Sequence, residues 1–309
     1  MKKSNMKKIL TTIWNKKILY LFILPALVWY FIFCYVPMSG LLLSIKEYSF
    51  SKGIYGSEFA EPIDKFFKLF FNNTNFWKLI RNTVLISVLK LITSFPAPII
   101  LALLLNEVRV NWFKRTVQTI SYLPFFISWI IVVTMLSQLL SPYGGPINDL
   151  KVSLFGGDTI FFMGERSWFL PIVLISNVWK SVGWGSIVYL AAMSNINPEL
   201  YEAARIDGAG KFQMIFKITL PSISSTIGIL FILAVGGLIS AGYDPIYLLQ
   251  QPGNLELSQI LDTYIVEVGL RQGNYSIATV ASMFQGVIAL ILVVTTNTIL
   301  RRTTEISLW

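Results

Sequence analysis

The residues best suited to chemistry form a polar stripe inside an otherwise apolar stretch. The stripe consists of Asn177, Lys180, Ser181 and Trp184. Spacings of three and four residues place these side chains on one face of a helix. An ammonium group in an apolar run is costly unless it faces a cavity or a partner. Hydrogen-bonding groups beside a flat aromatic surface suit a sugar, so the stripe predicts a solute pathway. The alternative is that Lys180 pairs with a neighbouring subunit and the other three residues pack helices.

Enzymatic chemistry finds little support in the residue content. The chain has no histidine and one cysteine, Cys34, which excludes histidine acid–base catalysis, Ser-His triads and most metal sites. The apolar runs hold no acidic pair, and Gly210-Lys211 is followed by Phe212 rather than by the hydroxyl residue of a phosphate-binding loop. We predict no catalytic residue, no metal site and no cofactor bound by this chain, which disfavours a membrane enzyme.

The composition is that of a membrane protein. Apolar residues make up 54% of the 309 residues and charged residues 13%, whereas a soluble domain has about 25% charged residues. A helix crosses the bilayer with about 20 apolar residues. Six runs meet this need, near 18–45, 82–105, 116–140, 167–193, 218–241 and 275–300. The predicted fold class is therefore all-α, a polytopic membrane protein with six transmembrane helices.

Loop charge predicts the orientation of these helices. With the N-terminus inside, the inner segments hold more Lys and Arg than the longer outer loops, as the positive-inside rule requires. The net charge of +9 is then mostly a charge of the cytoplasmic face and does not indicate nucleic acid. The prediction is one membrane domain (18–300) between cytoplasmic tails (1–17 and 301–309), with an inner loop at 194–217 and outer loops at 46–81, 141–166 and 242–274.

Prolines and one further lysine predict local features of the second and third spans. Pro96 and Pro98 should kink the second span near its middle, and Pro124 should break the third. Lys90 lies only nine residues after Arg81. We therefore expect its ammonium group to snorkel toward the headgroups.

Two outer segments and one glycine pair complete the local expectations. Residues 63–71 could form an amphipathic helix in the headgroup layer, and 257–270 has the spacing of a surface helix. Gly236 and Gly237 should let the fifth span approach a neighbouring helix closely, rather than act as a hinge.

The segment 197–221 is a charged island between two apolar runs. Asn197 can cap a helix, Pro198 suits its first position, and Glu199 favours the positive end of the helix dipole. The step at Gly208 should bend the chain before 211–219 restarts a helix. A bent pair of short helices on a membrane face predicts a docking element.

This island resembles the EAA loop of binding-protein-dependent ABC importer permeases. The matching residues are Glu202-Ala203-Ala204, Asp207, Gly208, Ala209, Gln213 and Ile218-Thr219-Leu220-Pro221. The pieces LPALVWYFIF, FPAPIILALLLNEV and FKRTVQTISYLPFFISW are similar to the MalF-like sugar permeases, and most similar to the subgroup for polysaccharides and complex oligosaccharides. The resemblance covers nearly the whole chain.

The resemblance implies a type I ABC importer permease fold in a bacterial plasma membrane. A second homologous permease would complete a heterodimer. A cytoplasmic ATPase dimer would bind ATP and Mg, and an extracellular solute-binding lipoprotein would deliver a carbohydrate. The residues that would couple to the ATPase are Glu202, Ala203, Ala204, Asp207, Gly208 and Ala209. By alignment with the sugar branch, Phe125 and Trp129 of the third span would join the stripe of the fourth in the substrate pathway.

Two alternatives stay open at this point. Asn177 agrees with the maltose pattern, whereas Lys180 and Trp184 depart from it. A lysine there would suit an acidic or strongly hydrogen-bonding saccharide, and a permease for a non-sugar solute is the first alternative. The second is a secondary transporter, which would need ion-coupling carboxylates or broken half-helices in the spans. The acidic residues lie almost entirely in loops, so this alternative is weaker.

Overall fold

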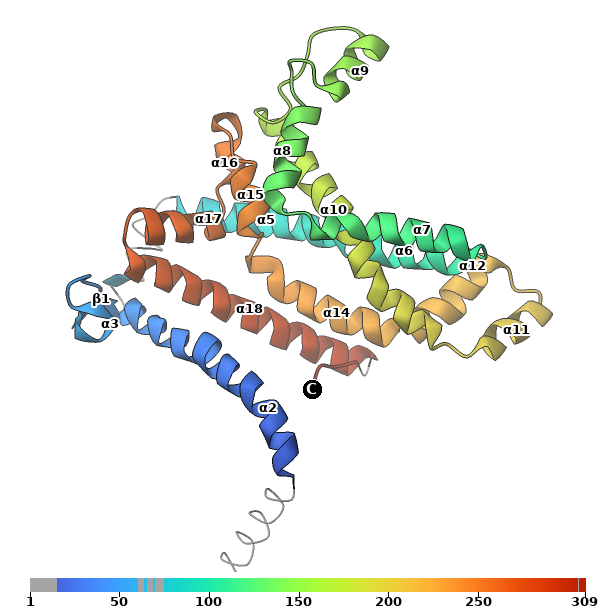
Figure 1. Cartoon of the computed structure of the whole chain (residues 1–309), viewed down its shortest axis with the longest axis horizontal. Coiled ribbons are helices and arrows are strands. Elements are labelled where there is room, and N and C mark those ends of the chain that lie inside the picture. The colour runs from blue at the N-terminus through green and yellow to red at the C-terminus, as the bar shows by residue number, and fades with distance from the viewer. Residues whose placement is uncertain (1–15, 61–63, 66–68, 70–74, 305) are drawn as a thin grey trace, which may run out of the picture.

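A computed structural model describes residues 16–60, 64–65, 69, 75–304 and 306–309 (Figure 1). In this part of the chain the secondary structure is helical apart from one short hairpin, which confirms the all-α prediction. Strands β1 (Lys46–Glu47) and β2 (Glu58–Phe59) pair antiparallel around the short helix α3 (Gly53–Gly56). The helix expected at 63–71 lies mostly outside the described residues.

The first span is a continuous rod from Lys17 to Ile45. It consists of α2 (Lys17–Tyr30), a π-helical turn η1 (Phe31–Tyr35) and a 3-10 segment η2 (Val36–Ile45). None of the side chains of α2 is buried, and Figure 1 shows α2 leaning away from the other helices. The end of the rod, η2, packs against the last span.

The second span begins earlier than predicted, and its prolines interrupt the helix without the sharp kink that was expected. Helices α5 (Phe76–Ser94) and α6 (Pro96–Glu107) form one 32-residue rod. Pro96 and Pro98 lack N–H groups, so the helix is interrupted at Phe95 without a sharp change of direction.

The third span is bent far more than a proline kink. Helix α7 (Asn111–Tyr122) passes through the 3-10 turn η4 (Leu123–Phe126) into α8 (Trp129–Leu139), and the two halves meet at 103°. Pro124 starts the break as predicted. Ser128 then caps α8 by accepting a hydrogen bond from Ile131 N. Together with α9 (Pro146–Phe155), α8 projects sideways from the bundle in Figure 1.

The fourth span is the 29-residue helix α10 (Arg166–Ser194). After it come α11 (Pro198–Ile206), α12 (Lys211–Met214), η5 (Ile215–Thr219) and α13 (Leu220–Ser222). The fifth span then continues as α14 (Ser224–Gly236) and η6 (Gly237–Ile239), bent by 64° from the preceding helices. The sequence did not predict this bend. Pro221 weakens the hydrogen-bond ladder directly before it.

The segment after the fifth span folds into short helices rather than one. They are α15 (Tyr243–Leu248), η7 (Pro252–Asn254), α16 (Leu255–Ser258), α17 (Leu261–Val266) and η8 (Glu267–Arg271). The single helix expected over 257–270 is therefore wrong in its first part. The Asn82 side chain donates to the carbonyls of Glu256 and Gln259, and Thr83 Oγ1 accepts from Leu261 N. These tertiary bonds satisfy backbone groups that a continuous helix would pair within itself.

The last span, α18 (Tyr275–Thr304), lies beside α14 (Figure 1). Gly236 is the close-approach residue: a Cβ there would lie 2.5 Å from the Val293 side chain of α18. This confirms the packing role expected for Gly236, but the same expectation is wrong for Gly237, where a Cβ would meet no atom within 4 Å. The chain then folds back, and Leu308 N donates to the buried Asn297 Oδ1.

The core is distributed along the bundle. Buried side chains gather in three clusters, around Phe169 and Ile246, around Phe76 and Leu261, and around Tyr189 and Ile223. In the described residues, the rods Lys17–Ile45, Phe76–Glu107 and Tyr275–Thr304 are long and apolar enough to cross a membrane, and the two bent pairs would raise the number to five. Helix α10 is as long as the first rod but more polar; counting it gives the six predicted spans.

Candidate functional site

Lys180 lies near the middle of α10, facing the bend of the third span. Its Nζ donates to the carbonyl oxygens of Pro124 (3.2 Å) and Phe125 (2.8 Å) and also to that of Ile127. The bend removes the i+4 N–H partners that these carbonyls would have in a continuous helix, although the Pro124 carbonyl still accepts from Ile127 N at 3.2 Å. The ammonium group therefore satisfies the broken backbone, and the bend in turn compensates a charge inside an apolar helix.

Aromatic rings surround this ammonium group. The Phe125 and Trp184 rings are stacked, with centroids 4.7 Å apart and planes 6° from parallel. Lys180 Nζ lies 5.7 Å from the centroid of Phe125 and 5.6 Å from that of Trp129, within cation–π range. The structure thus brings together the four predicted pathway residues Phe125, Trp129, Lys180 and Trp184.

The other two residues of the stripe turn elsewhere. Asn177 Nδ2 donates to Ser94 Oγ of α5 at 2.7 Å, and Ser181 Oγ donates to the Asn177 carbonyl within its own helix. Asn177 thus faces the second span, whereas Lys180 and Trp184 face the third. These assignments to a substrate pathway remain predictions.

A glycine sets the position of α10 against α7. A Cβ at Gly183 would lie 2.0 Å from the Ser121 carbonyl oxygen, closer than any side chain can come. Gly183 is buried, and in the sequence it lies between Lys180 and Trp184. The close crossing that it permits brings the η4 turn within reach of Lys180.

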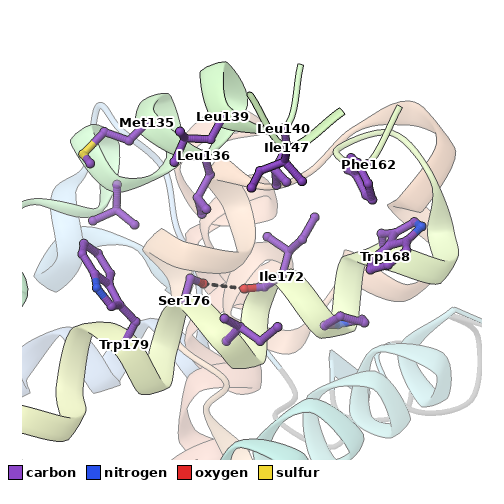
Figure 2. Close-up of a pocket in the computed structure, with 13 residues that line it drawn as sticks. Met135, Leu136, Leu139, Leu140, Ile147, Phe162, Trp168, Ile172, Ser176 and Trp179 are labelled. Carbon is purple, nitrogen blue, oxygen red and sulfur yellow. Dashed lines mark hydrogen bonds between the residues drawn. The ribbon is translucent and has the colours of Figure 1, made fainter. Parts of the chain in front are cut away.

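Two cavities adjoin α10, and they differ in chemistry. The larger, of about 370 Å³, lies between α8 and the first half of α10 (Figure 2). It is lined by aliphatic and aromatic side chains, and its one hydroxyl, Ser176 Oγ, donates to the Ile172 carbonyl in the same helix. Such a lining suits an acyl chain or an apolar helix better than a sugar, whose hydroxyls would lose their water without replacement.

The second cavity, of about 300 Å³, is lined in part by Lys90. The sequence predicts that the ammonium group of this residue snorkels toward the headgroups. That prediction is wrong. Because the second span begins at Phe76, Lys90 lies near its middle, and its Nζ donates to the Ala241 carbonyl at 2.8 Å. The depth of Lys90 follows from a helix that starts at Phe76. In the sequence, the polar residues Arg81 and Asn82 are instead typical of the end of a span.

The loop 194–217 forms the bent pair of helices predicted for it. Asn197 Oδ1 accepts from Glu199 N, so Asn197 caps α11 as expected. Gly208 has φ +76°, a left-handed conformation that favours glycine, and it turns the chain after α11. Gln213 Oε1 then accepts from Gly210 N at the start of α12.

The surface of this loop is open. Glu202, Ala203 and Asp207 are exposed, and Ala204 and Ala209 are half-buried. Apolar side chains are exposed among them: Ile206 is 87% exposed and Phe212 78%. An apolar patch rimmed by charges marks an interaction surface.

The loop is tied to the bundle at two points. Lys211 pairs with Glu107 at the end of α6, with 3.5 Å between Nζ and Oε2. The hydroxyls of Tyr201 and Thr219 share a hydrogen bond of 2.9 Å. These contacts connect the loop to the end of the second span and to the segment that leads into the fifth.

A second aromatic group lies in α15, the short helix that follows the fifth span. The Tyr243 and Tyr247 rings of α15 are stacked 4.9 Å apart, and the Arg271 guanidinium lies 5.3 Å from the Tyr247 centroid. Arg271 also pairs with Glu267 at 3.1 Å. Burial is the largest cause that raises the pKa of Tyr243, and the neighbouring Tyr247 raises it further. Tyr247 and Glu267 raise the pKa of Arg271.

Comparison with known families gives this arrangement its context. Residues 94–305 match the profile of the family described as the binding-protein-dependent transport system inner membrane component. The match includes α6, the bent third span, α10, the exposed loop and α18. The chain belongs to this family.

Individual relatives agree over nearly the full length. The permease is 42% identical over 301 residues to the polygalacturonan/rhamnogalacturonan transport system permease protein YteP of Bacillus subtilis (strain 168), covering 97% of this chain and 93% of the relative. It is also 42% identical over 286 residues to protein LplB of the same organism, covering 93% and 89%.

The fold agrees with a solved transporter. A chain in the crystal structure of a bacterial alginate ABC transporter, in complex with an alginate pentasaccharide-bound periplasmic protein, matches with a TM-score of 0.87 at 41% identity. The match covers 96% of this permease and 99% of that chain. The expected ABC importer permease fold is thereby confirmed, and the protein is a membrane-embedded transport subunit.

Proposed function

We propose that this permease is one membrane subunit of an ATP-driven importer that carries an oligosaccharide across a bacterial plasma membrane. The observation that carries the proposal is the near full-length similarity to a polygalacturonan/rhamnogalacturonan permease and to a chain of an alginate transporter. Polygalacturonan and alginate are both rich in uronic acids. Fragments of acidic polysaccharides are therefore the first substrates to test.

The site chemistry supports this substrate class. A stacked aromatic pair, an amide and hydroxyls lie beside two ammonium groups near the middle of the spans. Aromatic faces pack against sugar rings, and hydrogen-bonding groups replace the water that the hydroxyls lose. The proposed pathway residues are Asn177, Lys180, Ser181, Trp184, Phe125 and Trp129.

The proposed orientation has six spans with both termini in the cytoplasm. In Figure 1, α11 and α12 lie at one end of the bundle, and β1, α3 and α17 lie at the other. The first of these ends also carries Arg301 and Arg302 in the last turn of α18. Basic residues at one end support assigning it to the cytoplasmic side.

The exposed loop is the proposed contact with a cytoplasmic ATPase dimer, which would hold ATP and Mg in place of this chain. Its contact residues would be Glu202, Ala203, Ala204, Asp207, Gly208 and Ala209. A second, homologous permease would cover the unburied first span, and an extracellular binding lipoprotein would deliver the sugar. The alginate transporter matched here was crystallised with a sugar-bound periplasmic protein, which supports this last partner.

Reconstitution tests the proposal. The permease, its second permease, the ATPase and the binding protein would be placed in proteoliposomes, and ATP hydrolysis and sugar uptake measured together. We expect a binding protein saturated with oligogalacturonate to stimulate ATP hydrolysis at least about tenfold. It should also support sugar uptake that ionophores do not abolish. Stimulation by a non-carbohydrate solute alone would contradict the proposal.

A further inference from the structure

A polar cavity lies apart from the Lys180 group, between the second, fourth and fifth spans. Its polar lining consists of Ser87, Lys90 and Ser94 from α5, Asn177 from α10, and Ser240 after η6. We call it the Lys90 cavity. Its volume of about 300 Å³ is at the lower end of the range of about 300–1,000 Å³ typical of small-molecule sites. It therefore suits a single sugar ring rather than a whole oligosaccharide.

The ammonium group in this cavity has spare donors. It carries three N–H bonds, and in the described part of the chain it has one acceptor, the Ala241 carbonyl at 2.8 Å. The nearby carboxylate of Asp262 is occupied by other donors. It accepts from Ser240 Oγ (2.8 Å), Ala241 N (3.0 Å) and Gln285 Nε2 (3.0 Å).

Ser240 Oγ donates to Asp262, but the other two hydroxyl groups of the cavity have no acceptor among the described residues. Ser87 is 6% exposed, and its Oγ has no hydrogen-bond partner among the described residues. Ser94 Oγ accepts from Asn177 Nδ2, which leaves its own proton available to donate. A buried hydroxyl without a partner costs free energy, so these groups favour a ligand that supplies oxygen acceptors.

We infer that the Lys90 cavity binds the carboxylate-bearing ring of a uronic acid unit during transport. The spare ammonium N–H groups of Lys90 and the free hydroxyl proton of Ser94 match an acidic sugar, since charge-assisted hydrogen bonds to a carboxylate are stronger than neutral ones. The cavity shares Asn177 with the proposed pathway and so adjoins it at this residue. This inference rests on the proposed function and names the chemical group that the pathway would select.

The competing explanation is that Lys90 only ties α5 to the end of the fifth span through Ala241. The variant Lys90→Gln separates the two roles, because its amide can still donate to the Ala241 carbonyl but carries no charge. Lys90→Arg keeps the charge. Lys78→Gln, at an exposed position in the first turn of the same helix, is the matched control.

The test is equilibrium binding to the purified complex without its binding protein, whose own selectivity would otherwise enter. The probes are trigalacturonate and the same trisaccharide with its carboxyls reduced to alcohols. We expect Lys90→Gln to weaken trigalacturonate binding at least about tenfold and binding of the reduced trisaccharide less than about twofold. Lys90→Arg should retain most of the acidic affinity, and Lys78→Gln should match the wild type.

Three outcomes would overturn the inference. They are equal losses for both probes, no loss for either, and a wild-type complex that does not prefer the acidic probe. None of these outcomes contradicts the proposed function, because ATP-driven uptake of saccharides, including neutral ones, is measured separately. Failure of the wild-type complex to transport any saccharide would instead overturn the proposed function.

Discussion

Lys180 illustrates how the partner of a residue decides its role. Its type and depth alone predict a cation facing a solute. In the folded chain, three carbonyls at the bend accept hydrogen bonds from its ammonium group, and two aromatic rings lie within cation–π range of it. The charge is therefore largely compensated within the protein, and we expect Lys180 to hold the walls of the proposed pathway in place.

Removing that charge should cost stability before selectivity. Lys180→Met removes the charged donor from the carbonyls of Phe125 and Ile127 and one of two donors from that of Pro124. We expect a loss of about 2–4 kcal/mol from the lost charge-assisted bonds. The measurement is the thermal midpoint of the purified permease complex, which should fall by several degrees.

Two variants make this result specific. Lys180→Arg keeps donors and charge and should recover part of the loss, while Lys78→Met at an exposed position should leave the midpoint unchanged. A wild-type midpoint for Lys180→Met, combined with a loss of binding to acidic sugars alone, would show that Lys180 contacts the solute instead.

At the scale of the elements, the crossing of α7 and α10 depends on the absence of a side chain. Gly183→Ala places a Cβ about where the Ser121 carbonyl lies, so the two helices must separate. We expect a loss of several kcal/mol, measured as reduced yield and thermal midpoint of the complex. Gly286→Ala in α18 meets no atom within 4 Å and should be neutral or slightly stabilising. Equal behaviour of the two alanine variants would contradict this account.

The exposed loop should transmit force rather than stabilise the membrane part. Glu202 and Asp207 are exposed, so Glu202→Lys or Asp207→Lys should leave the fold intact. We expect either change to release the ATPase from the purified complex, or to uncouple ATP hydrolysis from uptake by at least about tenfold. Glu165→Lys, exposed at the start of α10 on the opposite side, is the control. Wild-type coupling in both loop variants would remove the loop from the proposed contact.

Elements governed by local chemistry were predictable from the sequence, and those governed by tertiary contacts were not. The cap at Asn197, the turn at Gly208 and the breaks at Pro96 and Pro124 each depend on one or two neighbouring residues. The 103° bend of the third span depends on the distant Lys180, whose ammonium group donates to the carbonyls at the bend.

The same reasoning explains the errors. The division of 257–270 depends on Asn82 and Thr83, which lie far away in the sequence. Lys90 was misplaced because the second span extends past the polar residues Arg81 and Asn82. In a water-facing helix those residues would mark an end, but Asn82 is buried against the backbone after α16.

At the scale of the whole molecule, most of the first span is not packed against the other helices of this chain. Its apolar side chains are exposed along α2, while η2 anchors the rod to α18 near Ser276, whose Oγ donates to the Lys46 carbonyl. A helix held at one end and unpacked along its length is suited to reach across to another subunit. This supports the proposed second permease.

The single cysteine allows a direct test, because Cys34 lies in η1, half-way along this rod, and is half-buried. A photo-crosslinker attached to Cys34 in the assembled complex should capture the second permease, identified by mass spectrometry. Moving the thiol to the buried end of the rod, with Cys34→Ser and Ser44→Cys, should give a crosslink within this chain instead, since Ser44 lies in η2, which packs against α18. Capture of this chain's own α14 or α18 from position 34 would mean that the rod folds back onto its own bundle, and the first span would then offer no argument for a heterodimer.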